Sequence, residues 1–362
     1  MSPIEYQYWF LSNEAVPYGK KYRMIEYFYD SYHIYHATES ELRECRILTS
    51  DEIYQFLELR GRQDIQKEYI RFSRGPFSFI TCEDDAFPDR LRNIYDPVYG
   101  VFILGKIPDL RKTVSIVGAR NCTAYGKKVA FELGRVLGEN GFTVISGMAR
   151  GIDSHSHRGC LETDGRTIAV LGSGIDVIYP PENNVLYQQI AGRGAVISEY
   201  PIGLAPLAKN FPRRNRIVSG LSDTLIVVEA REKSGSLITA DLALDQGKDI
   251  YIVPGRVGDA LSKGCNRLAT QGAGIIYSIE KFVEELSERY GDTPVSDSKK
   301  SNENKLTSEQ KDVIKLFDYY PVSLASAHAK SNMDYLKFLE IVMGLVTTGD
   351  LVEAFRGSYI LG

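Results

Sequence analysis

Six short apolar runs between residues 113 and 255 limit the folds that this chain can adopt. They are rich in Val, Ile and Leu and show no polar alternation, which is typical of parallel strands that helices cover on both faces. We therefore expect these runs to be neighbouring strands of one sheet. The runs are TVSIVG (113–118), FTVISG (142–147), TIAVLG (167–172), GAVISE (194–199), DTLIVVE (223–229) and DIYIVPG (249–255).

Helical sequence lies between several of these runs. The segment YGKKVAFELGRVLGENG, residues 125–141, has apolar residues at helical spacing and ends with a glycine, Gly141, that favours a helix stop. Repeated strand-helix units favour an α/β fold with a doubly wound, mostly parallel, Rossmann-like sheet. We predict such an extended Rossmann domain over residues 73–288.

Residues 1–72 have a different composition. They are rich in Tyr and carry apolar side chains at helical spacing, which predicts a small helical domain. The aromatic rings in this segment are expected to pack in its core. The apolar positions that define the pattern are Met24, Ile25, Phe28, Ile53, Phe56 and Leu57.

The C-terminal part divides into a linker and a third domain. Residues 289–305 contain almost no large apolar side chain, so we predict a flexible linker there. Thr307 and Gln310 form a capping-box pattern that begins a helix, and two more helical stretches and two short strands follow within residues 306–362. This order predicts a winged-helix-like domain.

The chain has no basic segment followed by an apolar run at its N-terminus and no run long enough to span a bilayer, so we expect a cytoplasmic protein without membrane contact. Its five cysteines are scattered and lack C-x-x-C spacing, which argues for reduced thiols and against a zinc site. The net charge is −4, so binding to nucleic acid would require a local positive surface.

The residues that follow the predicted strands are small or basic. Ligands of a doubly wound sheet bind beyond the carboxyl ends of its strands, and small residues let the backbone approach a ligand closely. Several of these loops lead into a helix, whose first amides favour phosphate. We therefore expect an anion-binding edge formed by Gly118, Ala119, Arg120, Ser146, Gly147, Met148, Arg150, Gly151, Gly172, Ser173, Gly174, Ser234, Gly235 and Ser236.

The loops do not match the common cofactor motifs. The first loop reads GARNCT instead of G-x-G-x-x-G, and no acid for a ribose follows at the expected distance, which argues against a dinucleotide. The segment TAYGKK lacks the first glycine and the Ser or Thr of a P-loop. We predict no cofactor.

We also predict no catalytic residue and no metal site. His155 and His157 are two residues apart on a predicted helix, so their side chains point to different faces. Asp153 and His157 are instead expected to form a pair at the start of this helix that orders the loop before it. Ser173 has no evident base partner.

The segment KNFPRRNR, residues 209–216, suggests what the anion is. No Asp or Glu lies between Glu199 and Asp223, and single-strand binders combine positive channels with rings on which bases stack. We expect these cations to join Arg120 and Arg150 in one groove for single-stranded nucleic acid. Arginine-rich segments are also typical of solvated faces or of salt bridges to nearby acids, Phe211 alone is typical of a core residue, and Gly118 and Gly172 also suit tight turns. The segment comprises Lys209, Asn210, Phe211, Arg213, Arg214, Asn215 and Arg216.

Five stretches resemble, in order and spacing, the bacterial DNA-processing protein A family, also called DprA or Smf. They are SIVGARNCTAYGKKVA, ISGMARGIDSHSHRG, TIAVLGSGIDVIYPPEN, the long run from FPRRNR to YIVPG, and SKGCNRLATQGA. The resemblance covers about residues 77–278. It implies an extended Rossmann fold that binds single-stranded DNA without a sequence requirement, forms homodimers and loads RecA recombinase onto the strand. It also implies protection of DNA during natural transformation and help in displacing single-strand-binding protein, with no enzymatic activity.

By this resemblance, Arg120, the SGMARG loop and the FPRRNR segment are expected to contact DNA, with Lys209 at a phosphate and Phe211 at a base. The first domain resembles the family's helical domain, of the SAM or helix-hairpin-helix kind, but has AVPYGKK where paired glycines are expected. Residues 306–362 hold five Lys and Arg against seven Asp and Glu, with Lys337 the only basic residue of the predicted recognition helix, which favours protein contact or packing over duplex DNA.

A nucleotide-processing enzyme is the alternative. The pattern EAREKSGSLITA is similar to the phosphate loop of nucleoside-monophosphate phosphoribohydrolases, although Lys233 and Ser234 stand where that loop has paired glycines.

Overall fold

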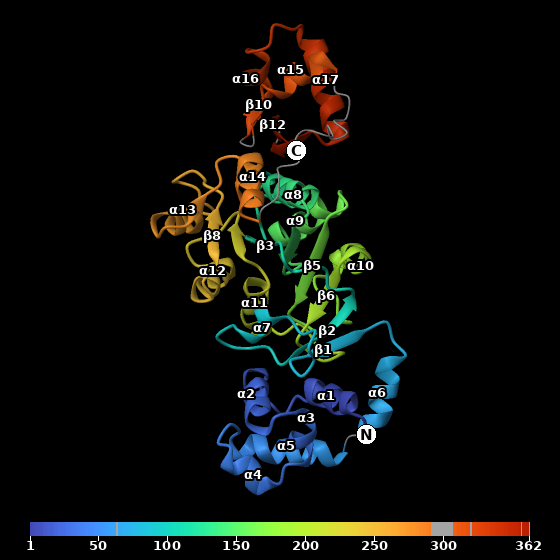
Figure 1. Cartoon of the computed structure of the whole chain (residues 1–362). Coiled ribbons are helices and arrows are strands. Elements are labelled where there is room, and N and C mark those ends of the chain that lie inside the picture. Colours follow the sequence, from blue (N-terminus) through green and yellow to red (C-terminus); the bar gives the residue numbers. More distant parts are fainter. Residues whose placement is uncertain (63, 291–306, 319–320, 356, 362) are drawn as a thin grey trace.

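The structure is a computed structural model that describes residues 1–362 except 63, 291–306, 319–320, 356 and 362. A helical part, a central sheet with its helices and a small C-terminal part follow one another in Figure 1. Most of the predicted linker, residues 291–305, lies outside the described residues. Its first predicted residue, Arg289, is instead the last residue of a helix. No helix in the described ranges combines the length and the apolar character needed to cross a bilayer.

The N-terminal part is helical, as predicted. Met24, Phe28, Ile53 and Phe56 are buried in its core, and Thr38 caps one helix by accepting a hydrogen bond from the amide of Glu41. The helices are α1 (Pro3–Ser12), α2 (Tyr18–Phe28), α3 (Ser31–His36), α4 (Glu39–Glu44), α5 (Ser50–Arg62) and α6 (Ile65–Ser73).

The central sheet contains all six predicted strands as β3 to β8. The strand order is β1-β2-β6-β5-β4-β3-β7-β8-β9. The seven strands from β6 to β9 in this order are parallel to one another, whereas β2 pairs antiparallel with β6 and β1 pairs antiparallel with β2. This confirms the mostly parallel α/β fold. The strands are β1 (Ser78–Thr81), β2 (Gly100–Gly105), β3 (Thr113–Val117), β4 (Thr143–Ser146), β5 (Arg166–Leu171), β6 (Ala195–Ser198), β7 (Thr224–Val227), β8 (Asp249–Ile252) and β9 (Gly274–Ile275).

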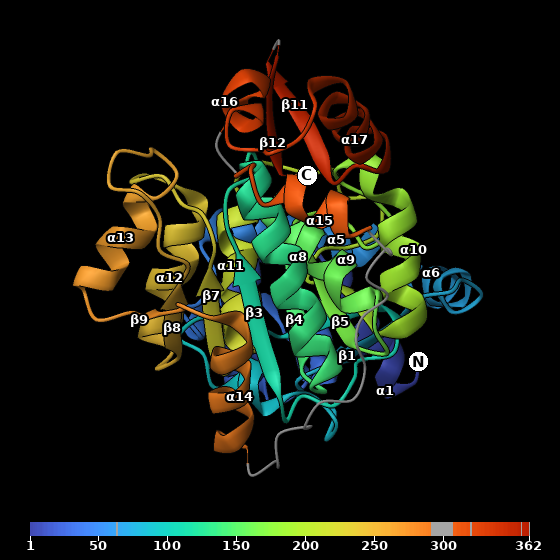
Figure 2. The same cartoon turned by 90° about the horizontal axis from the view of Figure 1, so that it is seen from above.

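Helices cover both faces of this sheet. Side chains of α8, α9 and α14 pack on Val114, Ile116 and Val144, whereas those of α11 and α12 pack with Ile145 and Leu225 in a second cluster. Figure 2 shows α8 and α9 in front of the strands and α11 behind them. The helices are α7 (Asp89–Arg92), α8 (Ala124–Glu139), α9 (Ile152–Leu161), the 3₁₀ helix η1 (Pro181–Asn183), α10 (Asn184–Arg193), α11 (Asn210–Gly220), α12 (Gly235–Asp245), α13 (Lys263–Thr270) and α14 (Ile279–Arg289).

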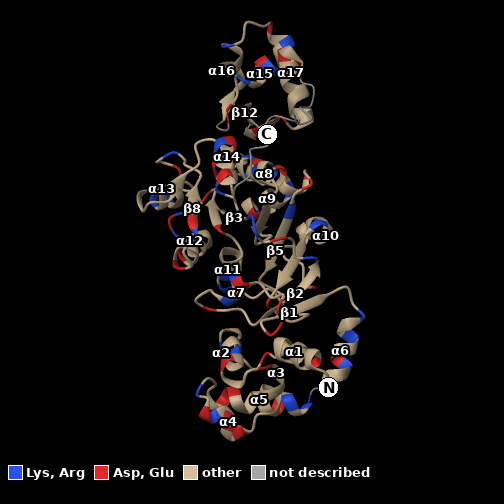
Figure 3. Ribbon diagram, in the orientation of Figure 1, with Lys and Arg blue, Asp and Glu red and all other residues tan. Residues whose placement is uncertain are grey.

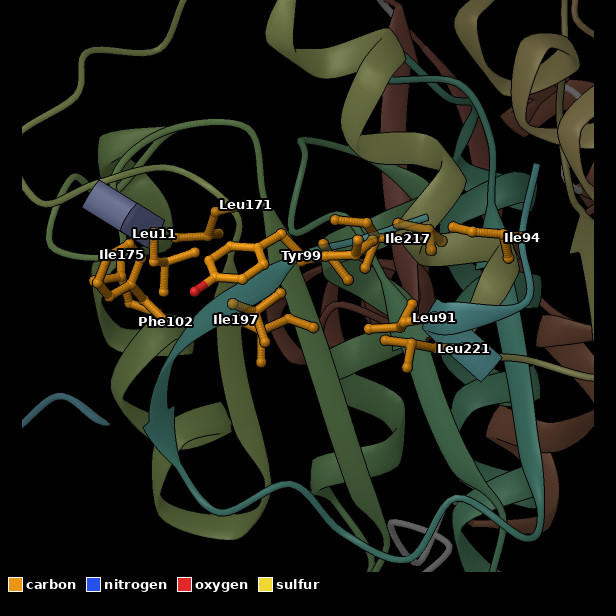
Figure 4. Packing of buried hydrophobic residues seen from close by; sticks show 14 of the residues in the cluster. Leu11, Leu91, Ile94, Tyr99, Phe102, Leu171, Ile175, Ile197, Ile217 and Leu221 are labelled. Carbon is orange, nitrogen blue, oxygen red and sulfur yellow. The ribbon is translucent and has the colours of Figure 1, made fainter. Parts of the chain in front are cut away.

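One core joins the N-terminal helices to the sheet. Leu11 of α1 lies in the same buried cluster as Phe102 of β2 and Ile197 of β6 (Figure 4). The backbone amide of Ser31, in α3, also donates to the carboxylate of Glu83, which follows β1, at 3.0 Å. The helical part and the sheet are therefore packed together by apolar and polar contacts.

The C-terminal part has its own core, which includes Val313, Phe338 and Leu345. Thr307 and Gln310 form the predicted capping box, and the amine of Lys337 is paired with Glu309. The winged-helix assignment stays a prediction. The elements are α15 (Ser308–Ile314), β10 (Val322–Ser323), α16 (Leu324–His328), α17 (Tyr335–Thr348), β11 (Leu351–Phe355) and β12 (Ser358–Leu361), with the three strands in the order β10-β12-β11.

Candidate functional site

The loops that follow β3, β4 and β5 meet beside the start of α11. These three strands are neighbours in the sheet, so their carboxyl ends lie at the same edge. An open pocket lies at this edge. It is lined by Arg120, Gly147, Ala149, Arg150, Tyr179, Pro180 and Phe211.

A cation and two rings form one wall of this pocket. The guanidinium carbon of Arg120, an exposed side chain, lies 5.2 Å from the centre of the Phe211 ring, within the range of a cation–π contact. The ring of Tyr179 lies 5.6 Å from that of Phe211, at an angle of 51°. Phe211 is only partly buried, so positive charge and an aromatic surface are offered side by side.

The loop from Gly147 to Gly151 forms the floor, and its backbone is held from inside the protein. The amides of Gly147 and Ala149 donate to the carboxylate of Asp153 at 3.2 and 3.3 Å. Arg214 donates to the carbonyl of Gly147 at 2.8 Å and also to that of Val170. Burial raises the pKa of Asp153, an effect that the charge of Arg214 opposes.

The expectation that the loop amides bind phosphate is therefore wrong for Gly147 and Ala149, because an internal carboxylate already accepts their hydrogen bonds. The same holds at the start of α8. Both the amide and the hydroxyl of Thr123 donate to the buried Glu229, at 2.9 and 2.5 Å. These three amides are therefore not free to bind an anion.

Asp153 orders the loop as predicted, but not by pairing with His157. The ring of His157 is fully buried and its Nδ1 lies 2.6 Å from the hydroxyl of Thr167. Burial lowers the pKa of His157 to about 3. No group of three or more His, Cys, Asp or Glu side chains in the described part of the chain is arranged to hold a metal ion.

The arginines of α11 do not all face the pocket. Arg214 and Arg216 are only 4% and 3% exposed, and Arg213 is half-buried. Arg213 and Arg216 both pair with Asp96, at 3.0 and 2.9 Å, and with Glu199. The predicted groove of six outward-facing cations is therefore wrong for Arg214 and Arg216, because internal acceptors lie beneath this helix. Figure 3 shows acidic and basic residues interspersed along the chain.

The N-terminal helices lie directly on these ion pairs. A Cβ atom on Gly19 of α2 would be 3.2 Å from the guanidinium of Arg213 and from the carboxylate of Asp96. Nearby, the rings of Tyr18 and Tyr200 are 4.9 Å apart in an edge-to-face contact. The charges of α11 therefore help to fix the helical part against the sheet.

Two of the predicted cations, Arg120 and Arg150, line the pocket. Arg150 is half-exposed and paired with Glu182, and Lys209 is exposed immediately before α11.

The other predicted residues support these loops. Gly172 lies against Phe211, since a Cβ there would be 2.9 Å from the ring, and Asn215 donates to the carbonyl of Gly235 at 3.3 Å. Gly118 packs on Ile152, the carbonyl of Ala119 accepts from the amide of Ile152, and the hydroxyls of Ser146 and Ser173 donate to the carbonyls of Ile116 and Val177. Four further predicted residues are buried: Met148, Gly151, Gly174 and Asn210. The hydroxyls of Ser234 and Ser236 form a hydrogen bond with each other at 2.8 Å.

Comparison with known proteins decides the family. The family model of DNA recombination-mediator protein A matches residues 78–287. The chain belongs to this family. One solved structural relative, DNA processing protein A of Streptococcus pneumoniae, aligns with a TM-score of 0.69 and 32% identity over 79% of this chain and 99% of that one.

Two curated members of the family show the extent of the match. The chain is 44% identical to DNA processing protein DprA of Bacillus subtilis, over 58% of this chain and 71% of that one. It is 41% identical to protein Smf of Synechocystis, over 58% of this chain and 54% of that one, so it spans about half of that relative. A structure of DNA processing protein A from Helicobacter pylori, described by its single-stranded DNA binding mode, aligns with a TM-score of 0.54 and 31% identity over 60% of this chain and 98% of that one.

Sequence reasoning did not single out Tyr179, Glu182 or Asp96, which line the pocket or pair with the predicted arginines. Tyr179 and Glu182 lie in the YPPEN segment, residues 179–183. The aromatic residue in this segment, which follows a predicted strand, could have indicated Tyr179 as a site residue. Asp96 offered no such signal, because it is 120 residues from its partner Arg216 along the chain.

Proposed function

We propose that this chain binds single-stranded DNA at the pocket edge formed by the loops after β3, β4 and β5. The observation that carries the proposal is the contact between the exposed guanidinium of Arg120 and the ring of Phe211, with Tyr179 beside it. Cations beside stacking rings are the combination that single-strand binders use. The structure of the Helicobacter pylori relative is described by its binding of the same ligand, single-stranded DNA.

In this proposal, phosphates contact Arg120, Arg150 and Lys209, while a base stacks on Phe211 or Tyr179. Every base has a ring face, so stacking selects for an unpaired strand but not for a sequence. A duplex would keep its bases away from these rings.

We further propose the wider role of the family for this chain: a cytoplasmic homodimer that protects single-stranded DNA, displaces single-strand-binding protein and loads RecA. The support is the family model, which is described as a recombination mediator, and the relatives described as DNA processing proteins. No catalytic step is part of this proposal.

Fluorescence anisotropy of a labelled oligothymidylate, titrated at several salt concentrations, tests the binding. We expect binding that weakens steeply with salt, and Arg120→Gln to lower both the affinity and the salt slope, the latter by about 0.7 for one lost phosphate contact. The matched control is Arg111→Gln, because Arg111 is exposed and precedes β3 at the opposite end of that strand.

Two results would contradict the proposal: no salt-dependent binding by the wild type, or equal effects of the two substitutions. Release of a base from a nucleoside monophosphate would instead support the phosphoribohydrolase alternative. In the loop that carries that resemblance, Ser234 and Ser236 hydrogen-bond each other.

A further inference from the structure

Glu182 forms an ion pair with Arg150, one of the residues that line the pocket. Both carboxylate oxygens face Arg150, whose Nε pairs with one oxygen and whose Nη2 donates to the other at 3.1 Å. The two side chains are 50% and 52% exposed. A two-point contact of this kind occupies the edge of the guanidinium that would otherwise bind a phosphate.

The fold holds Glu182 in this position. It lies in η1, and the next residue, Asn183, is 2% exposed and donates from its side-chain amide to the carbonyl of Met148 at 2.9 Å. Met148 belongs to the same loop as Arg150. The hydrogen bond between Asn183 and Met148 therefore holds the segment that carries Glu182 against the loop that carries Arg150. The backbone positions of both residues favour the ion pair.

The pair is nevertheless weak enough to exchange. Ion pairs between half-exposed side chains contribute little net stability, and a phosphodiester offers the same geometry of two oxygens. Hydrogen bonds from Arg150 lower the pKa of Glu182, so the carboxylate is charged at neutral pH.

We propose that Glu182 occupies the phosphate position at Arg150 and must be displaced by the bound strand, so that it sets how tightly the strand is held. This inference rests on the proposed function. It makes Glu182 an affinity-determining residue that favours release, since changes of this kind act mainly on the dissociation rate. A protein that hands a strand to a partner benefits from such a contact.

The test compares Glu182→Gln with the wild type in oligothymidylate anisotropy over a range of salt. We expect up to about fivefold tighter binding, the equivalent of about 1 kcal/mol. The salt slope should steepen by up to about 0.7, because Arg150 would no longer carry an internal counter-charge. Glu182→Asp keeps the charge but cannot hold both contacts, and should give a smaller gain.

Two controls separate local exchange from a general effect of charge. Glu139→Gln removes the same charge from another Arg–Glu pair, Arg135–Glu139, at the far end of α8, and should leave binding unchanged. In an Arg150→Gln background, Glu182→Gln should give no further gain.

The outcomes are distinct from those for the proposed function. Equal affinity and slope for wild type and Glu182→Gln, or a gain that persists without Arg150, would overturn the inference while leaving DNA binding in place. Failure of the wild type to bind oligothymidylate at all would remove the proposed function and the inference with it.

Discussion

The guanidinium of Arg216 donates to the carboxylate of Glu199 at 2.6 Å, and both side chains are almost completely buried, with 4% and 3% exposed. A second donor of Arg216 contacts Asp96 at 2.9 Å. The arginine therefore joins α11, the residue after β6 and the segment before β2. The sequence predicts Arg216 as a DNA contact, whereas in the structure it forms buried ion pairs within the protein.

Arg216→Met should consequently destabilise the fold. It leaves Glu199 buried without its closest partner, and breaking a buried pair in this way costs about 3–5 kcal/mol. Urea unfolding measures the loss. The double variant Arg216→Met with Glu199→Gln should recover part of it, because the uncompensated charge is gone. A stable single variant with a reduced salt slope for DNA would show that Arg216 acts at the strand instead.

Phe211→Ala should weaken DNA binding without changing its salt dependence. Loss of a base-stacking ring costs about 1–3 kcal/mol, and stacking releases no counterions. Anisotropy at several salt concentrations gives both quantities. Phe211→Trp should retain binding, and Tyr54→Ala, which removes a ring that is 69% exposed on α5, should have no effect. An altered slope at unchanged affinity would mean that the ring is not a base platform.

Gly147→Ala should disturb the pocket floor. A Cβ there would be 2.4 Å from Nη2 of Arg214, which is buried and bonded to the carbonyl of Gly147 itself. Overpacking at such a site costs about 1–3 kcal/mol. Thermal unfolding and anisotropy should both show a loss.

Gly235→Ala is the matched control for this substitution. Gly235 is also a strand-end glycine and begins α12, but a Cβ there meets no atom within 4 Å. It should be neutral or stabilising by up to about 1 kcal/mol. Equal behaviour of the two alanine variants would contradict the assigned contact with Arg214.

The strands were predictable because their signal is local. Apolar runs such as residues 167–172 contain only core side chains, and the same runs place the loops at one edge. The direction of the α11 side chains was not predictable, because it depends on partners distant in the chain. Asp96 and Val170 accept hydrogen bonds from Arg216 and Arg214 across 120 and 44 residues. A short stretch of sequence contains the arginine but not the distant residues that accept its hydrogen bonds.

The buried ring of His157 should make stability depend on pH. Its pKa is about 3 in the fold, against an ordinary value near 6.5, because burial disfavours the charged form. Between these values the unfolded chain binds a proton that the folded chain does not, so stability falls as the pH falls through this window. The loss is about 1.4 kcal/mol for each pH unit.

His157→Asn isolates this contribution, since its amide can still reach the hydroxyl of Thr167 while it cannot take up the proton. Urea unfolding at pH 4, 5, 6 and 7 should give a profile that is flatter than that of the wild type by about one proton. Groups such as Asp153 are present in both proteins, so their titration cancels in the comparison. Parallel profiles for the wild type and His157→Asn would mean that the ring takes up its proton without unfolding.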